Sequence, residues 1–132
     1  MNYVEHLVDD RLPGRNQALR VTFHEAVGDC QVSNMTTEWV ARTAGVPLLT
    51  PTPRDVWGLD TLDGTAASTE AVPSALFMYD EGYSELPSGN QAPEENGAHG
   101  SIRSLDSYHA NVGAFMESGV IHQSCDGPCD PN

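Results

Sequence analysis

Two apolar stretches, each leading into a polar turn, constrain the fold of this chain more than any other feature. Residues 19–27 are rich in β-branched and aromatic side chains and run directly into Gly28 and Asp29, as a buried strand ending in a turn does. Residues 74–80 are almost continuously apolar. Such runs predict strands with both faces covered. For the first run an alternating, half-buried strand is the competing interpretation, because every second residue from Val21 shares one face.

A helix pattern follows each predicted strand. Ser33 or Asn34 can cap the first helix, which ends at Gly45. The second begins at 106 or 107, carries apolar side chains at i, i+4, i+7 and i+8, and ends at Gly119. This apolar stripe consists of Tyr108, Val112, Phe115 and Met116. Strand, helix, strand, helix is the order of an α/β protein with a parallel sheet.

The remaining segments are loop-like, and the chain reads as one partial domain over residues 1–132. Residues 3–12 predict a short helix, while 46–72 and 81–100 are dense in turn-forming residues and predict long loops. Two strands are too few for a free-standing parallel sheet, whose faces and edges must all be covered. We therefore expect further structure from outside these segments.

Composition excludes several classes of partner. The formal net charge is −13, and all six basic residues are arginines. Such a chain repels nucleic-acid phosphates and anionic lipid headgroups, so neither is expected as a partner. No stretch approaches the roughly 20 apolar residues of a membrane span, and the N-terminus lacks the basic and apolar regions of a signal peptide.

Residues 120–132 form a Cys/Pro tail. Cys125 and Cys129 flank a Gly-Pro turn and could close a small disulfide loop, which suits an extracellular or periplasmic location; a pair of free thiols on a frayed tail is the alternative. Zinc is not expected, because Cys30 and the five histidines lie far apart in the sequence. No cofactor is indicated either.

Candidate site residues follow the two predicted strands. In doubly wound sheets, functional groups collect at the carboxyl ends of the strands. Asp29 lies directly after the first strand, and His99 lies in the loop after the second. Each has a structural alternative, since Asp29 can be the Asx residue of a tight turn and His99 an exposed loop histidine.

The two loops also resemble those of a known superfamily. Residues 28–34 (Gly-Asp-Cys-Gln-Val-Ser-Asn) resemble the acid loop of α/β-hydrolases, and residues 96–100 (Asn-Gly-Ala-His-Gly) resemble the histidine loop. The resemblance covers roughly residues 10–130 and implies the C-terminal half of a bacterial, secreted serine esterase or lipase. It implies Asp29 as triad acid and His99 as general base, acting on a small acyl substrate.

The nucleophile of that family is missing. No G-x-S-x-G segment occurs in the 132 residues, so the isolated chain is expected to hydrolyse nothing efficiently. The expected partner is the N-terminal half of the hydrolase or a self-association partner. The alternatives are a non-catalytic binding or assembly module of α/β type, and a small acidic domain of unrelated fold.

Other candidates are weaker. Trp57 and Leu59, in the long 46–72 segment, are predicted to wall an acyl pocket. His24 and Glu25 are adjacent in a strand pattern, which sends them to opposite faces and predicts structural roles. The acidic pair before His99, Glu94 and Glu95, is predicted to be solvated loop charge.

Overall fold

A computed structural model describes residues 3–8, 12–15, 19–65, 74–84, 89 and 93–130. Its centre is a four-stranded, all-parallel sheet in the order β1-β4-β2-β3. The strands are β1 (Val21–Ala26), β2 (Leu48–Thr50), β3 (Thr61–Asp63) and β4 (Ser74–Tyr79). The fold is therefore a mixed α/β fold, as the sequence predicts. The predicted helix near the N-terminus is a short 3₁₀ helix, η1 (Val4–His6), and residues 9–11 of that prediction lie outside the described residues.

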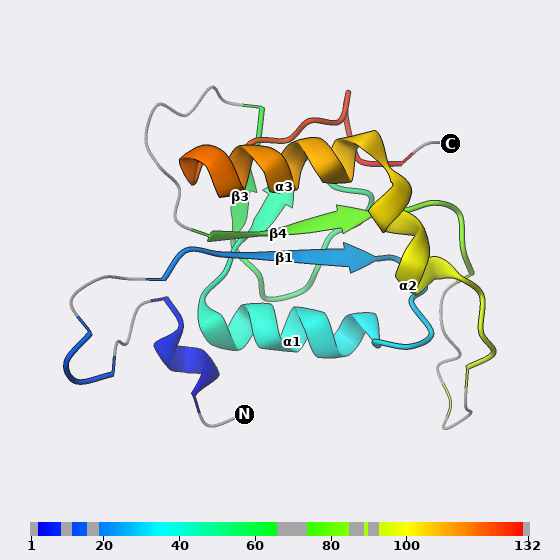
Figure 1. The fold of residues 1–132 in the computed structure, drawn as a ribbon. Helices are drawn as coiled ribbons and strands as arrows, with labels where there is room; N and C mark the ends of the chain where they lie inside the picture. The colour runs from blue at the N-terminus through cyan, green and yellow to red at the C-terminus, as the bar shows by residue number, and fades with distance from the viewer. Residues whose placement is uncertain are drawn as a thin grey trace.

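β4 is buried along its whole length, which explains its continuous apolar sequence. Leu76 and Met78 pack into one hydrophobic cluster, and Ala75, Phe77 and Tyr79 into a second cluster. Both clusters are needed because helices cover both faces of the sheet: α1 (Asn34–Ala44) lies on one face and α3 (Asp106–Ser118) on the other (Figure 1). Covering both faces is the usual condition of a parallel sheet.

The segment 46–72 is not the continuous loop that the sequence predicts. It contains β2 and β3, two strands of three residues each, and β2 lies between β4 and β3 in the sheet. Leu48 and Leu49 of β2 point to opposite faces and are both buried, so this short strand contributes to both clusters. Strands this short carry too little periodicity to stand out from the surrounding Pro, Thr and Gly residues.

The apolar stripe predicted on α3 is displaced around the helix. Tyr108 and Phe115 pack against the second cluster, but Met116 is 78% exposed and the buried residue is Asn111. At 100° per residue, positions 108, 111 and 115 share one face, and position 116 lies at its margin. The prediction was wrong at Met116 because a pattern of apolar residues does not count Asn111, the polar residue that the helix buries.

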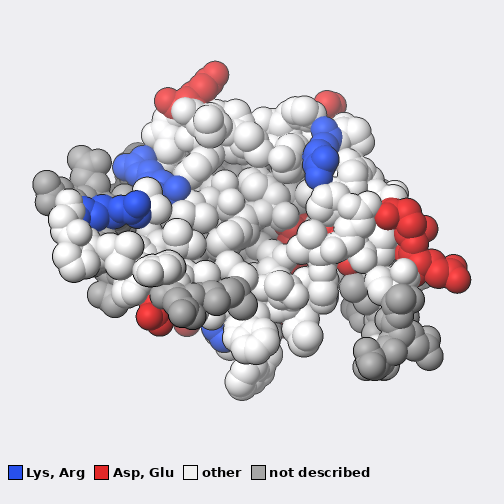
Figure 2. Space-filling model, turned by 60° about the horizontal axis from the view of Figure 1, so that its bottom comes forward, with Lys and Arg blue, Asp and Glu red and all other residues white. Residues whose placement is uncertain are grey.

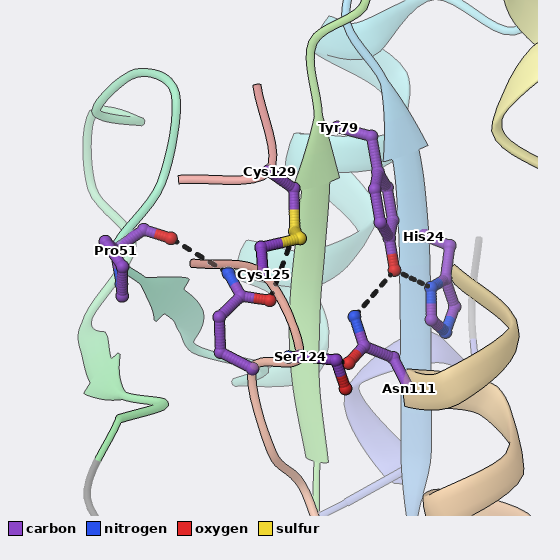
Figure 3. The surroundings of a disulfide bond; sticks show 8 residues. His24, Pro51, Tyr79, Asn111, Ser124, Cys125 and Cys129 are labelled. Carbon is purple, nitrogen blue, oxygen red and sulfur yellow. Dashed lines mark hydrogen bonds between the residues drawn. A yellow bond between two sulfur atoms is a disulfide. The ribbon is translucent and has the colours of Figure 1, made fainter. Parts of the chain in front are cut away.

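Asn111 connects three separate parts of the chain. Its Nδ2 donates to the Tyr79 hydroxyl at 3.0 Å, and its Oδ1 accepts the Ser124 backbone N–H at 3.0 Å. The Tyr79 hydroxyl also lies 3.2 Å from His24 Nδ1 (Figure 3). Buried polar groups stabilise a fold when they are paired, as the Asn111 amide and the Tyr79 hydroxyl are. This chain of hydrogen bonds joins α3 to β4, β1 and the C-terminal tail.

The C-terminal tail packs against the sheet, and its cysteines form a disulfide. Cys125 and Cys129 are bonded, Cys129 is buried, and its carbonyl accepts the Asp80 backbone N–H at 2.9 Å. The tail runs over the same face as α3 (Figure 1). In the part of the chain that the structure describes, no helix is long and apolar enough to cross a membrane.

Asn111→Ala should destabilise the fold. The substitution leaves the Ser124 N–H without its acceptor and removes a donor to Tyr79, a loss of about 1–3 kcal/mol for buried groups. Urea unfolding followed by circular dichroism measures the change. Met116→Ala on the exposed side of α3 is the matched control and should stay within about 0.5 kcal/mol of the wild type. Equal effects of the two substitutions would contradict the structural role of Asn111.

Candidate active site

The turn after β1 fixes the carboxylate of Asp29. Gly28 has φ +76°, and a Cβ added there would lie 2.6 Å from the Ser84 carbonyl oxygen, so both conformation and space require glycine. Asp29 Oδ1 accepts the backbone N–H groups of Gln31 at 2.8 Å and Val32 at 2.9 Å. These two bonds leave Oδ2 free to face the neighbouring loop.

The segment after β4 brings His99 to the same place. His99 lies in a single-turn helix, α2 (Ala98–Ser101), which begins after Gly97. Asn96 ties this turn to the acid loop, since its Nδ2 donates to the Gly28 carbonyl at 2.8 Å and its Oδ1 accepts the Ala98 N–H at 3.1 Å. The two loops therefore hold each other in place.

Glu95 is more than a solvated loop charge. Although exposed, it accepts hydrogen bonds from the Gly97 backbone N–H at 2.9 Å and from Gln31 Nε2 at 2.8 Å. The bond from Gly97 is the largest cause that lowers the pKa of the Glu95 carboxyl, and the bond from Gln31 is the next. Glu95 thus forms a second link between the two loops.

Asp29 and His99 form a hydrogen-bonded pair. His99 Nδ1 lies 2.8 Å from Asp29 Oδ2, inside the range of about 2.6–3.2 Å that an acid–base pair requires. The Asp29 side chain is 9% exposed and the His99 side chain 30%. Burial alone would raise the pKa of the Asp29 carboxyl, but hydrogen bonds from Val32, His99 and Gln31 outweigh it and lower that pKa. The carboxylate is therefore ionised where it meets the imidazole.

The second ring nitrogen of His99 identifies the tautomer. Arg103 Nη2 lies 2.9 Å from His99 Nε2. A guanidinium group can only donate, so Nε2 must be the acceptor and carry a lone pair. The ring proton then resides on Nδ1 and is donated to Asp29. This is the tautomer in which a triad histidine accepts a proton from a nucleophile.

A cavity of about 260 Å³ opens beside the pair. It lies between α1 on one side and α2, η2 (Ile102–Ser104) and α3 on the other, at the end of β1. Figure 2 shows one face of the molecule, with acidic atoms recessed between uncharged side chains and an arginine on the surface above them. The described lining residues are His24, Glu25, Ala26, Asp29, Val32, Asn34, Thr37, His99, Ile102, Arg103 and Tyr108.

The described lining contains neither serine nor cysteine. Its hydroxyl groups belong to Thr37 and Tyr108. Cys30, the remaining cysteine, is half-buried and unbonded to sulfur, but it does not line the cavity. Among the described residues, no group of three or more His, Cys, Asp or Glu side chains is arranged to hold a metal ion. The described wall of the cavity therefore holds a paired carboxylate and imidazole but no serine or cysteine side chain.

His24 and Glu25 lie on opposite faces of β1, as the alternation predicts. His24 stacks on Phe77 with ring centroids 4.8 Å apart, and burial lowers its pKa to about 4. Glu25 faces α1, where burial and the neighbouring Glu38 raise its pKa to about 8, against the opposing effect of Arg54. Arg54 contacts the carboxyl groups of Glu25, at 3.4 Å, and Glu38. Both residues are therefore uncharged at neutral pH and belong to the packing around β1.

Trp57 and Leu59 do not lie at this cavity. The carbonyl of the next residue, Asp60, accepts the N–H of Leu48, which is the first residue of β2. This contact places the segment at the amino ends of the strands, whereas Asp29 follows the carboxyl end of β1. Trp57 is 86% exposed with Arg42 over its ring, and Leu59 packs against the first cluster. The connection from β2 to β3 must return to the amino edge because the strands are parallel.

Three residues of the site were missed from the sequence alone. Asn34 was predicted as a helix cap, but its side chain bonds the Gly28 N–H and the Ala26 carbonyl. Asn96 and Arg103 were not singled out, although both lie within four residues of His99. The one available signal was the i, i+4 spacing of His99 and Arg103, which places them on one side of a helical turn.

Comparisons with protein-family models, with curated proteins and with solved structures give no match for this chain. The catalytic roles of Asp29 and His99 accordingly stay predictions, supported by the geometry of the pair.

Glu25→Gln should change how stability depends on pH. The folded chain binds the Glu25 proton more tightly than the unfolded chain does, so stability falls as pH rises from the ordinary value of 4.5 to about 8. His24 acts in the opposite direction, but only between about 4 and 6.5. Between pH 6.5 and 8 the wild type should therefore lose stability more steeply than Glu25→Gln in urea titrations. The exposed Glu117→Gln is the control, and identical slopes for wild type and Glu25→Gln would contradict this account.

Proposed function

We propose that this chain supplies the acid and the general base of a serine-hydrolase-type site, which cleaves a carboxylic ester or a related acyl group. The observation that carries the proposal is the 2.8 Å hydrogen bond between Asp29 and His99, with the Nε2 lone pair directed away from the carboxylate. In this arrangement the carboxylate orients the imidazole and stabilises the imidazolium that forms when a hydroxyl group is deprotonated.

The position of the pair in the sheet supports the same proposal. β1 and β4 are adjacent and parallel, and Asp29 and His99 lie beyond their carboxyl ends. Acid before histidine is also the chain order of α/β-hydrolases, which the two loops resemble. The disulfide between Cys125 and Cys129 supports an extracellular or periplasmic location.

The proposal requires a nucleophile from outside these 132 residues. The described sheet has two terminal strands, β1 and β3, and β1 is the one that lines the cavity, so its outer edge is where a further strand would reach the site. The Val27 N–H donates to Tyr79 of β4, so the alternate peptide groups at His24 and Thr22 point to the opposite, outer side. A segment paired there would lie beside the cavity, since His24 and Ala26 of this strand line it.

The functional test searches for that nucleophile in the cells that produce the protein. The chain is tagged, isolated with whatever it is attached to, and treated with a fluorophosphonate that labels activated serines. A serine outside residues 1–132 should be labelled, and His99→Ala or Asp29→Ala should slow its labelling by about 10³-fold or more.

His109→Ala removes an exposed histidine of α3 and serves as the control, with labelling unchanged. The proposal is wrong if no labelled serine depends on His99. It is also wrong if a residue of this chain, such as Thr37, becomes labelled in a His99-dependent way, because the nucleophile would then be internal.

A second candidate is a non-catalytic assembly module, favoured by the same open edge of β1. Unpaired strand edges promote association between chains. On either account the isolated chain should form dimers or larger species in sedimentation equilibrium. A monomer that unfolds cooperatively would contradict both the half-site and the assembly module. Association without any His99-dependent labelling would favour the module.

A further inference from the structure

Arg103 donates a hydrogen bond to His99 Nε2, the nitrogen that must accept a proton in the proposed reaction. His99 Nε2 has a single in-plane lone pair, and the guanidinium of Arg103 donates to it from 2.9 Å. A nucleophilic hydroxyl must donate its proton to this same lone pair. The base can therefore act only after Arg103 has moved from Nε2 to another acceptor.

The described wall of the cavity offers Arg103 no available carboxylate partner. Both oxygens of Asp29 are engaged, Oδ1 by two backbone N–H groups and Oδ2 by His99. Glu25 is held by Arg54 on the α1 side of the sheet, and its raised pKa of about 8 keeps it protonated at neutral pH. Among the described residues, no carboxylate forms an ion pair with Arg103. A carboxylate partner for Arg103 must therefore come from outside the described wall.

Arg103 is also the only permanent cation in the described lining of the cavity. Its side chain is exposed, so it can turn away from Nε2 without disturbing the core. The chain as a whole carries a net charge of −13 and repels anions. Arg103 therefore places a positive charge beside the base in a molecule that is otherwise strongly negative. A guanidinium matches the two oxygens of a carboxylate in a bidentate geometry.

We propose that Arg103 binds a carboxylate group of the acyl substrate, and that this binding draws the guanidinium off His99 and frees the base. The inference rests on the proposed function and specifies its substrate as an ester that also carries a carboxylate. A small ligand is favoured over a partner's side chain, because a cavity of about 260 Å³ is close to the size of small-molecule sites. Arg103 is thus a specificity-determining residue that also controls access to the base.

The test uses nitrogen-15 NMR of the complete chain, with butyrate as the probe and butyramide as its neutral analogue. Butyrate should shift the Arg103 Nε and His99 Nε2 signals in a saturable way, and butyramide should leave both unchanged. Arg103→Gln should weaken butyrate binding by about tenfold or more, the range for losing a charged hydrogen bond. Arg103→Lys should retain part of the binding, because it keeps the charge but loses the fork geometry.

Arg42→Gln is the control, since Arg42 is half-buried and contacts Trp57 away from the cavity. It should leave butyrate binding unchanged. Signals that do not respond to butyrate, or that respond equally in Arg103→Gln, overturn the inference. The inference is also overturned if butyrate does not bind but Arg103→Gln alters serine labelling in the native assembly. The group that accepts from Arg103 would then belong to a partner chain and not to the substrate.

The same spectra separate this inference from the proposed function. If the spectra of wild-type His99 show the proton on Nδ1 and an unprotonated Nε2, the proposed acid–base pair is supported even when butyrate has no effect. If His99 instead carries its proton on Nε2, the pair itself is wrong and the proposed function fails with it.

Discussion

Parallel pairing of β1 with β4 is the constraint on which the rest of the structure depends. The register runs from Val21 opposite Ser74 to Ala26 opposite Tyr79, so both strands end at the same level. Asp29 and the His99 turn follow these ends, which is why residues 70 positions apart meet. A shift by one residue would exchange the side chains that β4 directs into the two clusters, and neither cluster could then pack as it does. The hydrophobic register therefore also fixes the geometry of the polar pair.

Between the strands and the pair, short polar links complete the positioning. Asn96 bonds the backbone of the acid loop, Glu95 bonds Gln31 across the two loops, and two backbone N–H groups hold the Asp29 carboxylate. Rigid support of this kind is what a catalytic carboxylate needs, because its task is to hold an imidazole in one orientation. The two backbone N–H bonds, together with the bond from His99, also lower the pKa of the Asp29 carboxyl despite its burial.

The sequence predicts those parts of the fold in which local pattern and tertiary packing agree. The long apolar run of β4 and the two capped helix patterns were found because burial on both sides needs such residues. β2 and β3 were missed because three residues carry no period, and Asn111 was missed because a paired polar group can occupy a core position. Asp29 and His99 could be predicted from their place after the strands. The contact with Arg103 could not, since it depends on how a single helical turn is oriented.

Two of the five buried side-chain atoms without a hydrogen-bond partner in the described chain belong to residues that line the cavity. Glu25 Oε2 and His24 Nε2 are buried without a hydrogen-bond partner among the described residues, and both side chains belong to β1. Each such atom costs about 1–3 kcal/mol, a large share of a small domain's stability. On the α3 face of the sheet, the tail and its disulfide pack against the second cluster. Because both residues line the cavity at the open edge of β1, a segment that joined this edge could place its own side chains against them. The same addition would complete the wall of the cavity beside His99.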